Sequence, residues 1–245
     1  MKKYSIMTFN LLSDVVYPFG SKRFSRRLPA ILACLDEYKP DILCVQEYTR
    51  TMRQSLKPLG KDYQVFGEYR HSFIRNEANL IFIHKNHFKV SNYQTLWLSK
   101  TPTKKGSKLL LSQFPRIVTI VTLQNEQGKQ FNIANTHLDA GFESVRYEQL
   151  HILLSLLPKG PTILCGDMNT TLSGKTLSYL ESTWIRPQAL GSTLRGKFGS
   201  ARYKQEAVDQ ILLRQLKLLD IKKIKKDYVG QEPSNHCPLF AHFSL

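Results

Sequence analysis

The chain has 245 residues, and its hydrophobic and charged contents of 42% and 22% are those of an ordinary globular protein. A chain of this length buries enough surface to fold without disulfide staples, and no run of about 18 apolar residues could form a transmembrane helix. The net charge of +16 is unusual, and such a field attracts nucleic acid, anionic lipid headgroups or phosphorylated small molecules. A basic protein without a polyanionic partner is the plainer alternative.

The first half of the chain alternates strand-like and helix-like patterns. The run YSIMTFNLL predicts a first strand and not a signal peptide, because it lacks a long apolar core and carries Asn10. Residues 26–40 place apolar side chains at helical spacing before Pro40, which predicts a helix. The elements expected in this half are strands over 4–12, 41–47, 63–69, 78–85 and 90–98 and helices over 26–40 and 49–60.

The second half contains the clearest hairpin. Residues 117–138 form two alternating runs around NEQGK, a pattern typical of antiparallel strands joined by a short turn. Residues 142–158 then carry apolar side chains on one helical face. The further elements expected are strands over 161–169, 207–213, 217–226 and 238–243, a short helix over 176–182, and an irregular basic segment over 186–206.

These elements predict an α/β fold in a single domain over residues 1–245. Strands outnumber helices, and only some consecutive strands are separated by a helix, so a purely parallel sheet is not expected. Two packed, mostly antiparallel sheets flanked by helices satisfy this order of elements. No fixed-period repeat and no linker interrupt the pattern.

The four cysteines indicate a reducing compartment, and we expect a cytoplasmic monomer. They contain no CxxC pair, and Cys44 and Cys165 lie inside apolar runs, where a free thiol behaves as a small hydrophobic group. The absence of a Cys/His pair with ligand spacing also makes a zinc site improbable.

Polar side chains end several of the apolar runs. Asn10 ends the first strand, Glu47 ends a buried strand, and Asp167 and Asn169 follow a third. A carboxylate at such a place is costly unless it binds something. Taken singly, each residue is more simply a strand-end polar group or a cap. Together they predict a site for Mg²⁺, or Mn²⁺ in its place, because hard cations prefer oxygen ligands.

Two histidines lie beside these runs, His137 in NTHL and His236 in SNHCPL. A catalytic histidine needs a carboxylate to orient its ring. We expect Glu77 to orient His137 and Asp209 to orient His236. The other five histidines have weaker contexts and are expected to be structural or exposed. Arg116 follows a basic loop and is either a bidentate phosphate ligand or a surface arginine.

The positive charge gathers in three clusters, of which two lie in Gly/Ser/Thr-rich segments expected to be loops. The third is expected to be a solvated face. Phe198 and Tyr203, inside the second cluster, would suit contact with nucleic-acid bases. The clusters are Lys100, Lys104, Lys105 and Lys108; Arg195, Lys197, Arg202 and Lys204; and Lys222, Lys223, Lys225 and Lys226.

A series of short blocks resembles the endonuclease/exonuclease/phosphatase superfamily. They run in order from TFN at 8–10 to SNHCPL at 234–239: TFN, QE, E-x-N, N-T-H-L, G-D-x-N, an Asp in a strand, and S-x-H-x-P. One block is weak evidence, but the ordered series covers nearly the whole chain. The stretch TLWLSKTPTKKGSK resembles a bacterial branch of metal-dependent hydrolases. The resemblance implies a four-layer α/β sandwich with the site at one edge of both sheets.

The resemblance also implies a role for each matching residue. Arg146 is interpreted as a structural or supporting residue. Asn235 stands where the family usually has Asp, which lowers the negative charge near the metal. The implied roles are metal binding for Glu47, Asn10 and Asn235; positioning of water and developing charge for Asp167 and Asn169; phosphate contact for His137, His236 and Arg116; histidine orientation for Glu77 and Asp209; and substrate binding for Asn79.

The implied reaction is metal-assisted attack of water on a phosphate ester. Nucleic acid is the favoured substrate because of the basic loops. A small-molecule or phospholipid phosphodiesterase, or a phosphatase, is the alternative. A non-catalytic, polyanion-binding homologue is the alternative from a different class, for which Asn235 is the one indication.

Overall fold

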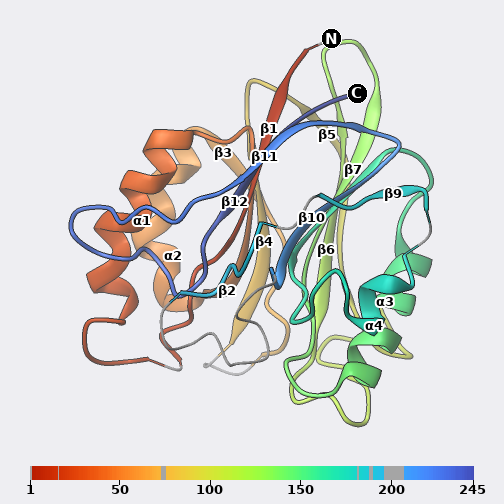
Figure 1. Ribbon diagram of the computed structural model, residues 1–245, viewed down its shortest axis with the longest axis horizontal. Coiled ribbons are helices and arrows are strands. Elements are labelled where there is room, and N and C mark those ends of the chain that lie inside the picture. The colour runs from red at the N-terminus through yellow and green to blue at the C-terminus, as the bar shows by residue number, and fades with distance from the viewer. Residues whose placement is uncertain (1, 16, 73–75, 181, 188–189, 196–206) are drawn as a thin grey trace.

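The computed structural model describes residues 2–15, 17–72, 76–180, 182–187, 190–195 and 207–245. Two six-stranded sheets pack face to face, with α1 and α2 outside one sheet and α3 and α4 outside the other (Figure 1). The strand orders are β11-β12-β1-β2-β4-β3 and β5-β6-β7-β8-β10-β9. The predicted class is therefore confirmed: the molecule is a four-layer α/β sandwich.

The bounds of the elements follow the sequence patterns closely. The helices are α1 (Phe24–Tyr38), α2 (Arg50–Leu56), the 3₁₀ helix η1 (Lys57–Lys61), α3 (Glu143–Leu156) and α4 (Lys175–Ser178). The strands are β1 (Tyr4–Asn10), β2 (Ile42–Thr49), β3 (Tyr63–Phe66), β4 (Glu77–His84), β5 (Lys89–Trp97), β6 (Ile117–Gln124), β7 (Gln130–His137), β8 (Thr162–Asp167), β9 (Trp184–Ile185), β10 (Asp209–Arg214), β11 (Lys217–Lys223) and β12 (Leu239–Ser244).

Several elements differ from expectation. The helix expected over 49–60 is α2 followed by the 3₁₀ helix η1, and the strand expected over 63–69 ends at Phe66. The helix expected over 176–182 is only the single turn α4. The strand expected over 217–226 ends at Lys223. The two-residue strand β9 was not predicted, because two residues carry no measurable periodicity.

Each sheet contains one parallel pair of strands crossed by a helix. In the first sheet β1 and β2 are parallel, and α1 joins them across the outer face. In the second sheet β7 and β8 are parallel, and α3 joins them in the same way. Each of these strands ends in or beside polar residues of the motifs, so both pairs deliver side chains to the same edge of the sandwich.

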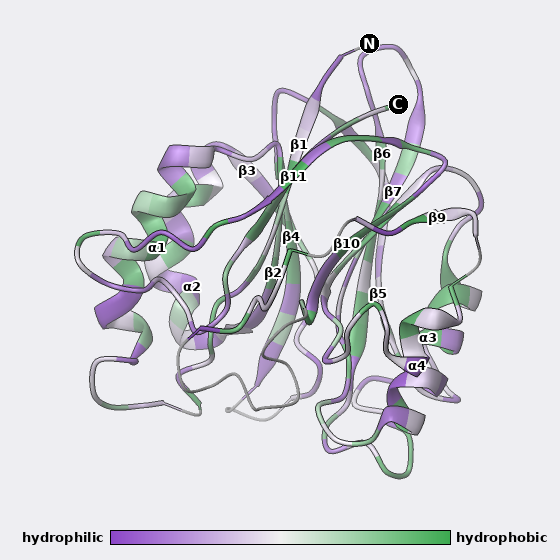
Figure 2. Cartoon of the chain, in the orientation of Figure 1, coloured by the Kyte–Doolittle hydropathy of each residue, from purple (hydrophilic) through white to green (hydrophobic). Residues whose placement is uncertain are grey.

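One part of the core lies between the sheets. Ile6, Ile81, Ile133, Ile211 and Phe243 belong to this inner cluster and have at most 1% of their surface exposed. Two further clusters lie between each sheet and its helices. Figure 2 shows hydrophobic colour running along the central strands, while the helices carry both colours. This pattern fits helices that pack one face on a sheet.

A buried polar network joins the two sheets near the motif-bearing edge. Gln46 Nε2 on β2 donates to Thr8 Oγ1 at 3.0 Å and to Asn135 Oδ1 on β7 at 2.7 Å. Asn135 Nδ2 in turn donates to the backbone carbonyls of Val45 and Leu80, each at 2.9 Å. These buried hydrogen bonds fix the register of one sheet against the other, while Gln46 Oε1 has no partner among the described residues.

All four cysteines are buried and none forms a disulfide. In the part of the chain that the structure describes, no helix has the length and hydropathy needed to cross a membrane.

Replacing Gly166 with alanine should lower the free energy of unfolding by about 3 kcal/mol. Gly166 lies on β8 with φ +132°, and a Cβ there would overlap the carbonyl oxygen of Thr136 on β7. Gly60→Ala is the matched control, because a Cβ at Gly60 meets nothing within 4 Å. Urea unfolding of both variants measures the difference, and equal effects would contradict the close approach of β7 and β8.

Candidate active site

The motif residues meet at one edge of the sandwich. Asn10 and Glu47 lie at the carboxyl ends of β1 and β2, and His137 and Asp167 end β7 and β8. Cα pairing places Asp167 opposite His137 on one side and opposite Asp209 on the other. Residues far apart in the chain are therefore held on neighbouring strands, without dependence on a loop.

Asp167 lies at the centre of the cluster and is 2% exposed. One of its oxygens, Oδ2, accepts a hydrogen bond from Asn10 Nδ2 at 3.0 Å. The same oxygen lies 3.5 Å from His137 Nε2 and 3.8 Å from His236 Nε2. Burial raises the pKa of Asp167 to about 6, against the attraction of His236 and with added repulsion from Asp209 and Glu47. A carboxylate in this state is a good acceptor for a proton or a cation.

Glu47 reaches the cluster through strained backbone. Its φ is +58°, and the register of β2 against β4 shifts between Val45 and Tyr48. This irregularity turns the side chain towards Asn10, whose Nδ2 donates to Glu47 Oε1 at 2.9 Å, and the backbone N–H of Ser13 donates to Oε2 at 2.7 Å. Left-handed backbone at a non-glycine residue is a recurrent mark of functional sites.

His236 and Asp209 form the predicted pair. His236 Nδ1 lies 2.8 Å from Asp209 Oδ2, and both residues are buried. Burial by itself would lower the pKa of His236, but the charges of Asp209, Asp167 and Glu47 outweigh it and raise the pKa to about 9. The ring is therefore a cation at neutral pH, with Nε2 directed towards Asp167.

His137 has the opposite character. Burial lowers its pKa well below the usual value, and the positive charges of Arg116, Arg70 and His236 lower it further. The two histidines on either side of Asp167 therefore differ in protonation, one neutral and one charged. Such a separation of pKa values is how one site provides acid and base groups at a single pH.

The expected pairing of His137 with Glu77 is wrong. Glu77 Oε2 instead lies 2.8 Å from Arg70 Nη1, and no hydrogen bond or ion pair joins Glu77 to His137 in the described part of the chain. The reason is the register of the sheets, which places the His137 ring against Asp167. Glu77 starts β4, and its charge is balanced by arginine.

Two buried arginines lie beside His137. Arg116 and Arg70 are 5% and 8% exposed, and each has a buried Nε without a hydrogen-bond partner among the residues described. Arg70 lies 4.6 Å and Arg116 6.0 Å from the ring centre of Phe114. Arg116 is thus not the surface arginine of the alternative interpretation. An unsatisfied buried guanidinium is suited to an anion that enters the site.

The three asparagines lie at different depths. Asn169 donates its backbone N–H to Asp167 Oδ1 and its Nδ2 to the Leu138 carbonyl, both at 2.9 Å. Asn79 Nδ2 donates to the Ile117 carbonyl at 3.0 Å, so Asn79 joins the two sheets in this state. Asn235 is half-buried, and its Oδ1 accepts the Ser234 hydroxyl at 3.3 Å.

The donor set fits a hard divalent cation. Glu47, His137 and Asp167 each offer one ligand atom, and these atoms lie within 4.8 Å of one another; the same holds for Asp167, Asp209 and His236. Repulsion from Asp209 and Glu47 helps to raise the pKa of Asp167, and a bound cation would relieve that repulsion. Carboxylate and amide oxygens are ligands that Mg²⁺ accepts.

Asp139 and Arg146 support the site from behind it. Asp139 is fully buried and accepts hydrogen bonds from Ser112 Oγ, the Gln113 N–H and the Gly141 N–H, so it joins the loop before β6 to the loop after β7. Arg146 donates to the carbonyls of Asp139 and Gly141, as expected of a supporting residue. Only its hydrogen bonds distinguish Asp139 from an ordinary polar loop residue.

Arg195, the first residue of the second basic cluster, is not available to a substrate. Arg195 is 5% exposed, and its Nη1 lies 2.7 Å from Asp227 Oδ1, so its charge is used inside the protein. The other residues named in that cluster, Lys197, Phe198, Arg202, Tyr203 and Lys204, lie outside the described residues.

A model of the endonuclease/exonuclease/phosphatase family matches residues 7–224. The chain belongs to this family. Nocturnin of Homo sapiens is 29% identical to it over an alignment of 205 positions that covers 73% of this chain and 46% of Nocturnin. The chain spans about half the length of the relatives it matches.

Two solved structures of the family show the same fold. A mannosyl-6-phosphatase of Bacteroides thetaiotaomicron has a TM-score of 0.81 and 20% identity, covering 99% of this chain and 100% of that chain. TDP2 of D. rerio, complexed with a single strand DNA product, has a TM-score of 0.78 and 17% identity, covering both chains completely. At these identities the likeness supports the fold, and family members are phosphoester hydrolases.

Proposed function

We propose that the protein is a metal-dependent phosphodiesterase whose favoured substrate is nucleic acid. One observation carries the hydrolytic part: a neutral His137 and a cationic His236 lie 3.5 and 3.8 Å from the same oxygen of Asp167. Beside them, Arg70 and Arg116 offer buried guanidinium groups without full hydrogen bonding. This arrangement supports binding of a phosphate and transfer of protons next to it.

In the proposed reaction water attacks phosphorus in line with the leaving oxygen. Asp167 accepts a hydrogen bond from the water and takes its proton, since its pKa of about 6 allows both states near neutral pH. His236 donates from Nε2 to a phosphoryl oxygen while Asp209 holds its Nδ1. Mg²⁺, or Mn²⁺, would be held by Glu47, whose Oε1 accepts a hydrogen bond from Asn10 Nδ2, and would supply charge neutralisation at the phosphate. Asn169 holds the orientation of Asp167 through its backbone N–H.

The nucleic-acid part of the proposal is supported by charge and by likeness. The net charge is +16, and Lys100, Lys104 and Lys108 lie in the loop between β5 and β6, at the edge that carries the site. TDP2, which shares the fold, is known in complex with DNA. The alternative, hydrolysis of a small phosphate ester, is supported by the fold that the chain shares with the mannosyl-6-phosphatase. The intact cluster around Asp167 argues against a non-catalytic homologue.

We also propose that the protein is a monomer and that it is cytoplasmic. The four unpaired thiols support the cytoplasmic location.

An activity panel separates these substrates. With Mg²⁺ present, we expect hydrolysis of single-stranded DNA, supercoiled DNA and bis-p-nitrophenyl phosphate, and little release of phosphate from sugar or inositol phosphates. Binding of nucleic acid should weaken steeply with salt, with a log–log slope of about −0.7 to −0.9 for each phosphate contacted. Faster turnover of phosphate monoesters than of any nucleic acid would replace the proposal by the small-ester function.

A further inference from the structure

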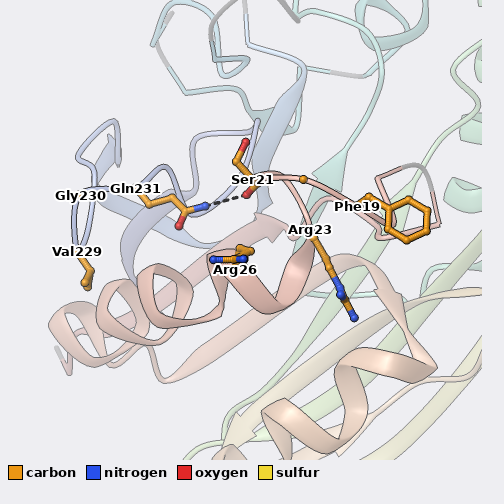
Figure 3. Close-up of a pocket in the computed structure, with 8 residues that line it drawn as sticks. Phe19, Ser21, Arg23, Arg26, Val229, Gly230 and Gln231 are labelled. Carbon is orange, nitrogen blue, oxygen red and sulfur yellow. Dashed lines mark hydrogen bonds between the residues drawn. The ribbon is translucent and has the colours of Figure 1, made fainter.

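A surface hollow lies between the loop after β1 and the turn after β11 (Figure 3). It encloses about 630 Å³, and its lining includes Phe19, Arg23, Arg26 and Val229. In Figure 3, Val229 and Phe19 stand at its two ends and Arg26 lies between them. Gln231 Nε2 donates to the Ser21 carbonyl at 2.9 Å, which holds the two walls together.

Both ends of the hollow present apolar side chains to solvent. Phe19 is 82% exposed and Val229 is 76% exposed. Val229 also has φ +53°, a conformation that β-branched residues rarely adopt, in a turn closed by paired backbone hydrogen bonds between Tyr228 and Gln231. Exposed apolar groups are suited to contact with another molecule.

The charge of this hollow is entirely positive. No acidic side chain lines it. Arg23 and Arg26 are exposed, and neither has an ion-pair partner among the described residues. Free guanidinium groups bind phosphate through two parallel N–H donors. The hollow therefore suits a ligand that combines phosphate groups with flat apolar groups.

A second hollow extends from the first hollow towards the candidate active site. It encloses about 260 Å³, shares Ser21, Gly230 and Gln231 with the first, and reaches Asn235, the neighbour of His236. Its acidic side chains, Asp227 and Glu232, lie 2.7 and 3.9 Å from the single guanidinium of Arg195, and Lys22 and Arg27 line the same hollow, so its lining carries no net negative charge. A polyanion that leaves the site past Asn235 would thus enter the arginine-lined hollow.

We propose that the two hollows form a binding track for the single strand next to the scissile phosphodiester. In this track Arg23 and Arg26 contact its phosphates, and Phe19 stacks on an unpaired base. The inference rests on the proposed nucleic-acid substrate and specifies which surface binds it. A single strand is specified because a duplex hides its base faces, whereas stacking on an aromatic ring accepts any unpaired base. A bilayer fits less well, since it takes up protruding apolar groups and not a concave, polar floor.

The test compares a long and a short substrate in the same variants. The substrates are a single-stranded DNA of about 12 nucleotides and bis-p-nitrophenyl phosphate. The variants are Phe19→Ala and the double variant Arg23→Glu, Arg26→Glu. The control is Lys89→Glu, Lys129→Glu, an equal charge change on exposed residues at the end of the molecule opposite the site.

We expect each track variant to lose about tenfold or more in kcat/KM on the oligonucleotide relative to its change on the small diester. The arginine variant should also reduce the salt slope of binding by about 1.4, which corresponds to two phosphates. The control should match wild type on both substrates. Equal losses on both substrates, or losses no larger than the control's, would overturn the track.

The two proposals fail in different ways. If wild type hydrolyses the small diester but the track variants treat both substrates as wild type does, only the track is overturned. If wild type hydrolyses neither substrate with Mg²⁺, the proposed function is overturned and the track with it. If the same variants abolish binding to vesicles of anionic phospholipid while oligonucleotide cleavage is unchanged, the hollow binds a lipid surface and the track is overturned.

Discussion

Glu47→Gln is expected to reduce metal-dependent hydrolysis by at least about 100-fold and to leave the protein folded. The substitution keeps the shape of the side chain and one acceptor oxygen for the Ser13 N–H, but it removes the negative charge that a divalent cation needs. Glu68→Gln is the matched control, because Glu68 is exposed and its ion pair among the described residues is with Lys105 at the surface. Wild-type turnover of Glu47→Gln at saturating Mg²⁺ would exclude Glu47 as a metal ligand.

A second measurement on the same variant does not depend on turnover. A ligand that binds the native state raises the unfolding temperature by mass action. Mg²⁺ or Mn²⁺ should therefore raise the unfolding temperature of wild type and of Glu68→Gln, and should raise that of Glu47→Gln much less. An equal rise in all three proteins would place the bound cation elsewhere.

Asp209→Asn is expected to turn His236 from a cation into a neutral ring at neutral pH. Asp209 contributes most to raising the pKa of His236 to about 9, and without its charge, burial, which lowers that pKa, is opposed by the smaller contributions of Asp167 and Glu47. In wild type the contribution of His236 to the rate should persist to about pH 9. In the variant it should already be lost near neutral pH, so the deficit in kcat/KM grows as pH rises from about 5.5 to 8.5.

The same pair has a signature in stability. A histidine whose pKa is raised in the native state stabilises the fold fully below pH 6.5, and that stabilisation is lost as pH rises through about 9. Asp209→Asn should remove this dependence. Asp220→Asn is the control, because Asp220 pairs with His242 at 2.8 Å on the surface, away from the site. Parallel pH profiles for wild type and Asp209→Asn, in activity and in urea unfolding, would contradict the assigned charge of His236.

The sequence predicts the strands and their polar ends because both signals are local. Asp209 begins a strand of six residues, and His236 follows Ser234 in a short motif, so each could be located without knowledge of the partner. The predicted pairing of Asp209 with His236 is confirmed. Asp209 also lies next to Asp167 in the sheet. The roles of the other site residues follow only from the resemblance of the ordered motifs to a family.

The pairing of Glu77 and the use of Arg70 could not be predicted in this way. Which side chain faces His137 depends on how one sheet is placed against the other, and no periodicity within a strand reports that. Arg70 lies in a loop without a pattern, and its importance is visible only from its burial and its contact with Glu77. Arg195 shows the converse error, since a basic run says nothing about which of its members is ion-paired inside the fold.

The division of the site between two sheets has a consequence for folding kinetics. One sheet supplies Asn10 and Glu47, and the other supplies His137, Asp167 and Asp209. A chain in which only one sheet has formed therefore holds only part of the site. Upon dilution from denaturant, hydrolytic activity should therefore return later than the circular dichroism signal of the strands, at the step in which the sheets dock. A partly folded chain cannot cleave phosphate esters, and the rate at which activity returns measures sheet docking directly.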